Sequence, residues 1–283
     1  MGERLLGRAP RGDDRCREPH VRHHDRADEN AARAATGRRL RNVTHDEPTK
    51  VAVALSDVRA RVAAAAARAN RDASTVRLVA VTKTIAVERL REALVAGAHD
   101  FGENYVQEWR GKADTLAEES ATGAIAWHFV GRLQRNKVKY VVGRVALVHA
   151  IDSLELAEEL ANRAAARGVV QTGLVEVNVA GETTKAGFEV TEAVRALRKM
   201  QSLAGLRVAG FMTMPPPTEN PDDSRGSFRA LRELRDRAQN EVGVAFPELS
   251  MGMSGDFEVA IEEGATLVRV GTAIFGARVP REV

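Results

Sequence analysis

The stretch LVAVTKT, residues 78–84, joins a run of apolar residues with high strand propensity to a lysine, and a helical pattern follows at once. Alternate side chains of a strand share one face, so Val79, Val81 and Lys83 are expected to point the same way. We therefore expect Lys83 at the carboxyl end of a buried strand, where partial desolvation lowers the pKa of its amine and favours Schiff-base chemistry. A surface lysine that merely ends a strand is the alternative that this stretch alone leaves open.

The alternation of strand and helix continues along the chain and predicts the fold class, α/β. Helical patterns cover residues 87–97, 153–168, 191–203 and 227–243. Eight strands separated by helices favour a single closed (β/α)8 TIM barrel over an open doubly wound sheet. A nucleotide-binding open sheet is also disfavoured because the glycine-rich dinucleotide fingerprint is missing after the first strand. The expected strands span residues 76–83, 99–104, 125–131, 146–151, 172–179, 207–214, 248–253 and 266–271.

Residues 1–48 differ from the rest of the chain. They are rich in Arg, Asp, Glu and His and show no sustained apolar period, so we expect a disordered tail. The run HVRHH at residues 20–24 suggests a metal tract, and the arginines suggest a nucleic-acid arm, but interleaved acidic residues favour a solvated tail. An alanine-rich amphipathic helix is expected over residues 50–71, within a barrel domain that spans residues 49–283.

The composition excludes several classes of protein. The net charge of +3, from 42 basic and 39 acidic residues, provides no strong field for nucleic acid. The apolar stretches are too short to cross a membrane. A single cysteine, Cys16, excludes an internal disulfide and a cysteine-rich metal site, and it is consistent with the cytoplasm. No spacing of His, Asp and Glu forms a convincing metal site.

Polar residues fall at the carboxyl ends of the expected strands, which is where the active sites of such barrels lie. Glu103 and Asn104 end the second strand, and Glu176 and Asn178 share one face of the fifth. A carboxylate that faces a barrel interior needs a partner, so Glu176 is informative. His128, on the third strand, is more simply interpreted as a satisfied core histidine.

The run ELSMGMSGDFEVAIEEGATLVRVGTAIFG contains a candidate anion site. Ser254 is predicted at a helix N-cap with Asp256 in the first turn, and Arg269 and Gly271 share one strand face. Gly271 leaves room for a ligand near the backbone, and Thr272 adds a hydroxyl. Together they indicate a phosphate cradle, because loops after the last two barrel strands often bind phosphate. An ordinary N-cap and a tight turn remain the alternative.

An amine on the first strand, a phosphate cradle after the last two strands and an inward-facing arginine suit an aldehyde that carries a phosphate. Pyridoxal 5′-phosphate has this chemistry, since a lysine forms its internal aldimine and a protein group faces its pyridine nitrogen. Arg269 would take that last position, where a cation disfavours protonation of the ring nitrogen and weakens the cofactor as an electron sink.

At these residues the sequence resembles the YggS/PROSC family of pyridoxal-phosphate-binding proteins, which is similar to the N-terminal barrel of alanine racemase. The resemblance runs from about residue 51 to residue 278 and implies a role in pyridoxal phosphate (vitamin B6) homeostasis. The matching motifs are LVAVTKT, FGENYVQE, WHFVGRLQRNK, FMTMPP, LSMGMSGDFEVAI and VRVGTAIFG. The cofactor-binding residues that it implies are Lys83, Asn104, Met212, Ser254, Arg269, Gly271 and Thr272.

The resemblance assigns a role to each of these residues. Lys83 is the cofactor lysine, Arg269 faces the ring nitrogen, and Asn104 and Met212 lie near the ring. Ser254, Gly271 and Thr272 hold the phosphate, whereas Ser250 falls inside a strand and is a weaker candidate. The KAGF loop implies that Lys185 lies at the site mouth as a transient second cofactor lysine.

The implied function is a cytoplasmic carrier of pyridoxal phosphate that limits the free aldehyde and passes it to apoenzymes. It is expected to be a monomer or weak dimer, with neither nucleic acid nor membrane as a partner. The alternative is a pyridoxal-phosphate-dependent amino-acid racemase or decarboxylase on the same barrel. Those enzymes add a C-terminal β domain, and only residues 277–283 follow the eighth strand, so a catalytic role is not expected.

Overall fold

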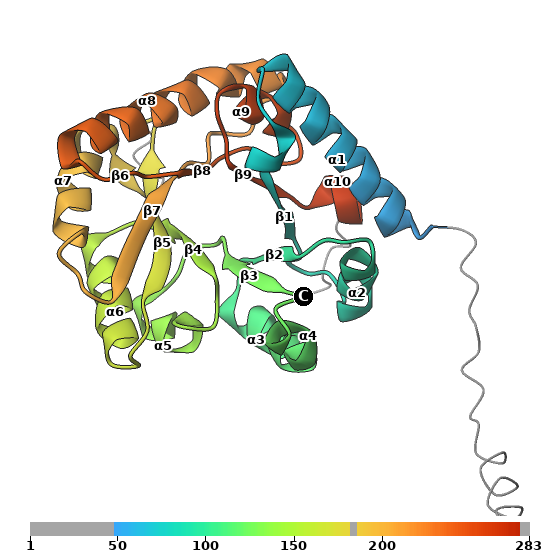
Figure 1. Ribbon diagram of the computed structural model, residues 1–283, viewed down its shortest axis with the longest axis horizontal. Helices are drawn as coiled ribbons and strands as arrows, with labels where there is room; N and C mark the ends of the chain where they lie inside the picture. Colours follow the sequence, from blue (N-terminus) through green and yellow to red (C-terminus); the bar gives the residue numbers. More distant parts are fainter. Residues whose placement is uncertain (1–47, 182–185, 278–283) are drawn as a thin grey trace, which may run out of the picture. The chain divides into compact units, whose positions relative to one another are not determined.

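The computed structural model describes residues 48–181 and 186–277. Its nine strands form one parallel sheet in the order β4-β3-β2-β1-β9-β8-β7-β5-β6, and a further β4–β5 pairing closes the ring. Strand β6 pairs with β5 outside this ring, so the closed barrel has eight members, as predicted (Figure 1). The strands are β1 (Arg77–Val81), β2 (Asp100–Glu103), β3 (Ala126–Phe129), β4 (Leu147–Ile151), β5 (Gln171–Asn178), β6 (Phe188–Glu189), β7 (Leu206–Met212), β8 (Glu248–Ser250) and β9 (Leu267–Val270).

Helices surround the ring of strands in the view of Figure 1. The four helical patterns identified in the sequence correspond to α2, α6, α7 and α8. The α-helices are α1 (Lys50–Arg68), α2 (Val87–Val95), α3 (Val106–Thr115), α4 (Ala117–Ala121), α5 (Val138–Val141), α6 (Leu154–Ala165), α7 (Val190–Met200), α8 (Arg225–Val242), α9 (Phe257–Glu262) and α10 (Thr272–Phe275). Short 3₁₀ turns are η1 (Ala73–Thr75), η2 (Arg135–Lys137) and η3 (Pro221–Ser224).

Helix α1 confirms the amphipathic helix that precedes the first strand. The Thr49 side chain accepts a hydrogen bond from the Ala52 N–H and so caps the helix. The helix ends at Arg68, three residues earlier than predicted, and Asn70 then adopts a left-handed conformation (φ 52°) that turns the chain toward β1. Arg61 anchors the helix to α9 through an ion pair with Glu258 at 3.0 Å.

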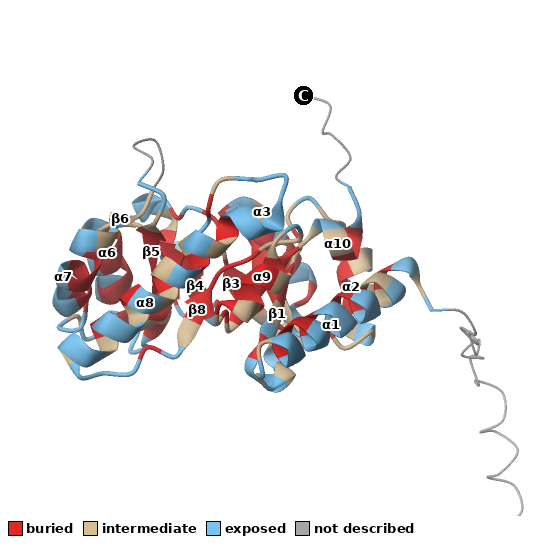
Figure 2. Ribbon diagram, turned by 90° about the horizontal axis from the view of Figure 1, so that it is seen from above, coloured by how far each residue is buried: buried red, intermediate tan, exposed pale blue. Residues whose placement is uncertain are grey.

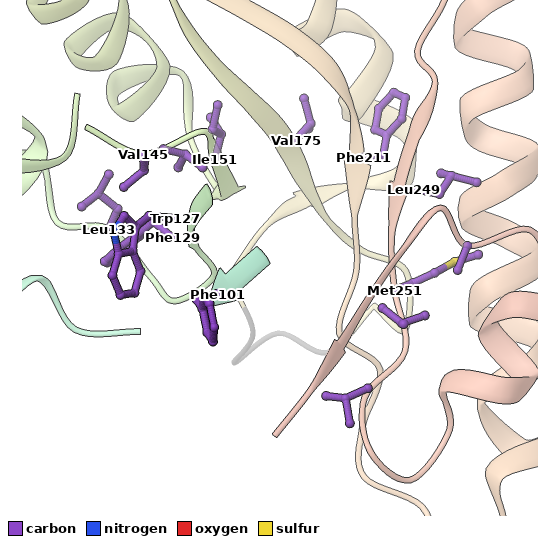
Figure 3. Close-up of a cluster of buried hydrophobic side chains, with 14 of the residues drawn as sticks. Phe101, Trp127, Phe129, Leu133, Val145, Ile151, Val175, Phe211, Leu249 and Met251 are labelled. Atoms are coloured by element: carbon purple, nitrogen blue, oxygen red, sulfur yellow. The ribbon is translucent and has the colours of Figure 1, made fainter. Parts of the chain in front are cut away.

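The apolar core has two layers. The larger layer lies between the barrel and its helices, and Figure 3 shows part of it, including Phe101, Trp127 and Phe211. A smaller cluster fills the barrel itself, and its members are Val79, Leu147, Ala150, Leu174, Met212 and Leu267. Val79 and Leu267 therefore face inward while Ala80 and Val268 face the helices, as the strand alternation predicts.

Burial follows the same layers in Figure 2, where the strands are mostly buried and the outward faces of the helices are exposed. In the described ranges, no helix combines the length and apolar character needed to cross a membrane. The same ranges hold no group of three or more His, Cys, Asp or Glu residues arranged for a metal ion. The HVRHH tract and Cys16 lie outside the described residues.

Gly210→Ala should destabilise the barrel, because the β7–β8 pairing leaves no room for a side chain at this position. An added Cβ would lie 1.9 Å from the carbonyl oxygen of Glu248, its register partner on β8. We expect a loss of at least about 2 kcal/mol in the free energy of unfolding, measured by urea titration.

Gly226→Ala is the matched control, because Gly226 lies in α8 and its added Cβ would meet no atom within 4 Å. Alanine is the better helix former, so this variant should be stabilised by about 0.5–1 kcal/mol. Equal stability of the two variants would contradict the tight β7–β8 contact.

Candidate functional site

The predicted lysine lies beside the predicted phosphate residues. Lys83 follows the end of β1 by two residues and is half-buried. It lines a small hollow together with Gly271, Thr272 and Phe275. The pairing of β1 with β9 creates this proximity, because Val79 and Arg269 are register partners and both strands then run on toward the same end of the barrel. Lys83 lies four residues after Val79, and Gly271 lies two residues after Arg269.

Ser254 joins the same group, but not in the way the sequence suggested. The prediction of a helix N-cap at Ser254 is wrong, because α9 begins at Phe257 and Asp256 takes the N-cap position. Residues 254–256 form a turn instead, which Asp256 stabilises by accepting a hydrogen bond from the Met253 N–H at 2.6 Å.

The Ser254 hydroxyl instead reaches the start of α10. It accepts hydrogen bonds from the N–H groups of Gly271 (3.2 Å) and Ala273 (3.4 Å). A Cβ at Gly271 would lie 3.2 Å from the carbonyl oxygen of Val81, so glycine permits the close approach of this turn to β1. Two backbone N–H groups therefore converge on one hydroxyl at the turn that carries Gly271, and Gly271 also lines the Lys83 hollow.

Arg269 faces the barrel interior from β9 and is 6% exposed. Its guanidinium donates to the Ser250 hydroxyl at 2.5 Å and to the carbonyl oxygen of Thr213 at 3.0 Å. Burial lowers the pKa of Arg269 to about 10, and the negative charges of Asp256 and Glu176 limit the fall. The side chain is thus a fixed cation at neutral pH.

A chain of hydrogen bonds continues from Arg269 through the barrel. Ser250 contacts His149 Nδ1 at 2.8 Å, His149 Nε2 contacts His128 Nδ1 at 2.9 Å, and His128 Nε2 contacts Asp100 Oδ1 at 2.8 Å. Burial and the neighbouring cations hold the pKa of His149 well below its ordinary value, so this ring is neutral. A neutral ring has one N–H and one acceptor nitrogen, so His149 donates in one of its two hydrogen bonds and accepts in the other.

The far end of this chain is the carboxylate of Asp100. Burial acts to raise the pKa of Asp100, but the hydrogen bond and the charge of His128 outweigh it, so the pKa lies below its usual range. Asp100 is therefore ionised and accepts the last hydrogen bond. His128 is a satisfied core histidine, as expected, and Ser250 supports Arg269 from within its strand. The sequence analysis missed His149, although a histidine within the buried strand LVHAI was a usable signal.

Asn104 and Met212 do not line the Lys83 hollow. Asn104 lines a larger hollow of about 1090 Å³ over the ends of β2, β3 and β4, and Arg132 and Asp152 also line it. This hollow shares no lining residue with the one that contains Lys83. Met212 is 2% exposed and belongs to the interior cluster. Lys185 lies outside the described residues.

The whole barrel is similar to known proteins. The family model "Alanine racemase, N-terminal domain" matches residues 53–279. The pyridoxal phosphate homeostasis proteins of Aquifex aeolicus and Pseudomonas aeruginosa are 48% and 40% identical to the chain, and the matches cover 79% and 81% of this chain and 96% of each relative. The chain belongs to the pyridoxal phosphate homeostasis protein family.

Solved structures support the same assignment. PipY of Synechococcus elongatus, in a structure with pyridoxal phosphate bound, is 30% identical and has a TM-score of 0.69 over 80% of this chain and 100% of its own. An alanine racemase from Corynebacterium glutamicum is 14% identical, with a TM-score of 0.63 over 81% of this chain and 61% of that one. At that identity the racemase shares the barrel fold alone.

Glu176→Gln should change how the stability of the barrel depends on pH. Burial, helped by the charge of Asp152, raises the pKa of Glu176 to about 7, and Arg269 opposes the rise. The folded state thus binds a proton that the unfolded chain releases near pH 4.5. The protonated Glu176 side chain therefore makes its full contribution to the free energy of unfolding below that pH. This contribution, up to about 3 kcal/mol, is lost as the pH rises to about 7.

The measurement is urea unfolding between pH 4 and pH 8 for both proteins. The variant should show a smaller loss of stability over this window, since glutamine does not titrate. Parallel curves for the two proteins would contradict the raised pKa of Glu176.

Proposed function

We propose that this protein binds pyridoxal 5′-phosphate and acts as its carrier, with Lys83 as the residue that bonds to the aldehyde. The observation that carries the proposal is that Lys83, Gly271 and Thr272 line one hollow, and that the N–H groups of Gly271 and Ala273 meet at the Ser254 hydroxyl next to it. A relative with pyridoxal phosphate bound over the same barrel supports it. The homologues are named as homeostasis proteins rather than as enzymes, which favours a carrier.

The phosphate group would be held by Ser254, Gly271 and Thr272. The N–H groups of Gly271 and Ala273 are directed at one point, where they bond the Ser254 hydroxyl, and they are the donors that an anion needs. The Thr272 side chain, at the start of α10, adds a second hydroxyl.

Arg269 would face the ring nitrogen. The cofactor supplies an aldehyde and an electron-withdrawing ring, and a neighbouring cation disfavours protonation of that ring. Ser250 and Thr213 fix the guanidinium, so its charge stays inside the barrel. We assign Asn104 and Met212 to the surroundings of the ring, as the resemblance implies.

The covalent step is a condensation. The neutral Lys83 amine would supply the nitrogen of a C=N bond that replaces the aldehyde C=O bond, and its two protons would leave with the oxygen as water. The reverse reaction with water releases the cofactor. A carrier needs this reversibility. Three further features stay predictions: transfer to apoenzymes, a cytoplasmic location and a second cofactor lysine at Lys185. A racemase or decarboxylase on the same barrel is the alternative, and assays with amino acids separate the two.

Purified protein mixed with pyridoxal phosphate should develop the visible absorbance of a lysine adduct, and borohydride should fix it. Mass spectrometry of the reduced protein should locate the adduct on Lys83. Lys83→Ala should lose the adduct and keep phosphate-anchored binding, measured by equilibrium dialysis. A colourless wild-type protein, or an adduct confined to other lysines, would refute the proposal.

Ser254→Ala should weaken binding of pyridoxal phosphate by about tenfold, the effect of losing one charge-assisted hydrogen bond of about 1.5 kcal/mol. Dialysis measures the affinity, and inorganic phosphate should compete less well with the variant than with the wild type. Ser202→Ala, at an exposed serine beyond α7, is the control and should bind as the wild type does. Unchanged affinity in both variants would remove Ser254 from the phosphate site.

A further inference from the structure

A buried lysine on α3 lies against the loop that carries Lys83. The Lys112 side chain is only 7% exposed, and its ammonium donates three hydrogen bonds. The acceptors are the carbonyl oxygen of Thr82 (2.5 Å), Glu103 Oε1 (2.6 Å) and Glu108 Oε1 (2.8 Å). An ammonium has three protons, so these contacts use all of them. Lysine is seldom buried, and it is tolerated here because every donor has a partner.

One hydrogen bond of Lys112 and one of Glu108 bracket Lys83. The Thr82 carbonyl belongs to the peptide group before Lys83, and it accepts directly from Lys112. The Thr84 N–H belongs to the peptide group after Lys83, and it donates to Glu108 Oε1. The same carboxylate oxygen accepts from Lys112, so one ion pair holds the backbone on both sides of Lys83. We call Lys112, Glu103 and Glu108 the α3 clamp.

The conformation that the clamp holds is a strained one. Thr84 has φ +66°, in the left-handed region, which a β-branched residue rarely adopts. A residue in this region persists only when its surroundings fix it, and such strain concentrates at functional sites. The hydrogen bond from the Thr84 N–H to Glu108 Oε1 holds Thr84 in this conformation. Without that bond, the loop would relax and carry Lys83 with it.

The third member of the clamp fixes the residue before Lys83. Glu103 Oε1 accepts from the Thr82 hydroxyl at 2.6 Å, and both side chains are fully buried. Burial raises the pKa of Glu103, and the adjacent Glu108 charge adds to the rise, while Lys112 opposes it. Two carboxylates around one buried ammonium are costly to desolvate and stabilise little by themselves. This arrangement instead provides a defined backbone geometry around Lys83.

We propose that Lys112 and Glu108 are positioning residues that fix the backbone of Lys83 so that its amine meets the aldehyde of a phosphate-anchored ligand. The proposal rests on the proposed function, because it assigns the clamp a purpose at the same site. It predicts that the clamp governs formation of the covalent bond and leaves the anchoring of the phosphate unchanged. Pyridoxine 5′-phosphate separates the two, since it has the ring and the phosphate but no aldehyde.

The test uses Glu108→Ala in the full chain. This variant removes the acceptor of the Thr84 N–H, while Lys112 keeps its contacts to Glu103 and Thr82, so the barrel should fold. The ratio of adduct to unbonded cofactor should fall by about tenfold, since small misplacements of a reacting group carry penalties of that size or more. The affinity for pyridoxine 5′-phosphate should stay within about twofold of the wild type.

Two further variants make the test specific. Thr84→Gly in the Glu108→Ala background should recover part of the adduct, because glycine adopts φ +66° without strain. Glu118→Ala, at an exposed carboxylate on α4, is the control and should behave as the wild type does. Amide hydrogen exchange at Thr84 adds a measurement without cofactor, and its protection should fall in Glu108→Ala.

The outcomes distinguish this proposal from the function on which it rests. A wild-type adduct that persists unchanged in Glu108→Ala overturns the positioning role alone. Equal losses of adduct and of pyridoxine 5′-phosphate affinity also overturn it, because they indicate a general loss of structure. A wild-type protein that forms no lysine adduct overturns the proposed function and this inference together, even if Thr84 keeps its protection.

Discussion

The pairing of β1 with β9 is the constraint on which the rest of the structure depends. It joins residues 77–80 to residues 267–270 and places Val79 opposite Arg269. Every feature of the candidate site follows from that register, because Lys83 lies beyond β1 and Gly271 beyond β9. A shift of one residue would turn Arg269 out of the barrel and into the apolar layer under the helices. The contact is also among the most distant in sequence, so the site can form only when the barrel closes.

The barrel interior is divided between a small apolar cluster and a polar chain. The apolar cluster is built around Val79, Leu174 and Met212. The polar chain runs from Arg269 to Asp100 and places a cation and a carboxylate at opposite ends of a row of hydrogen-bonded side chains. Buried polar groups are tolerated only when they are paired, and hydrogen bonds in a chain polarise one another. Part of the interior is therefore polar rather than apolar, and these polar contacts hold Arg269 in a defined orientation.

The sequence was sufficient for the fold and for much of the site because both follow from local periodicity. Strand alternation predicted an inward-facing arginine, and Arg269 is buried in the barrel interior against Ser250. The eight strands are each present, although most are shorter than predicted, because ladder pairing stops where the strands diverge into loops. Gly271 and Thr272 lie with Lys83, as the motifs implied.

What the sequence could not supply was the set of contacts made across the barrel. Ser254 resembles an N-cap by spacing, yet its hydroxyl bonds a segment seventeen residues away. Lys112 resembles a solvated helix residue by pattern, yet it is buried against Thr82. His149 has its partners on β3 and β8. Periodicity reports the face on which a residue lies, whereas these partners depend on which strands become neighbours.

The site therefore combines parts that are fixed by different elements. The anion donors are held where the Ser254 turn meets the start of α10, Arg269 is held from within the barrel, and the loop of Lys83 is held by α3. Each part gains its position when the chain folds, so a ligand would not have to provide the free energy of ordering them. A protein that must release its ligand as readily as it binds it gains from this arrangement. The strength of binding can then be set by the donors and the amine.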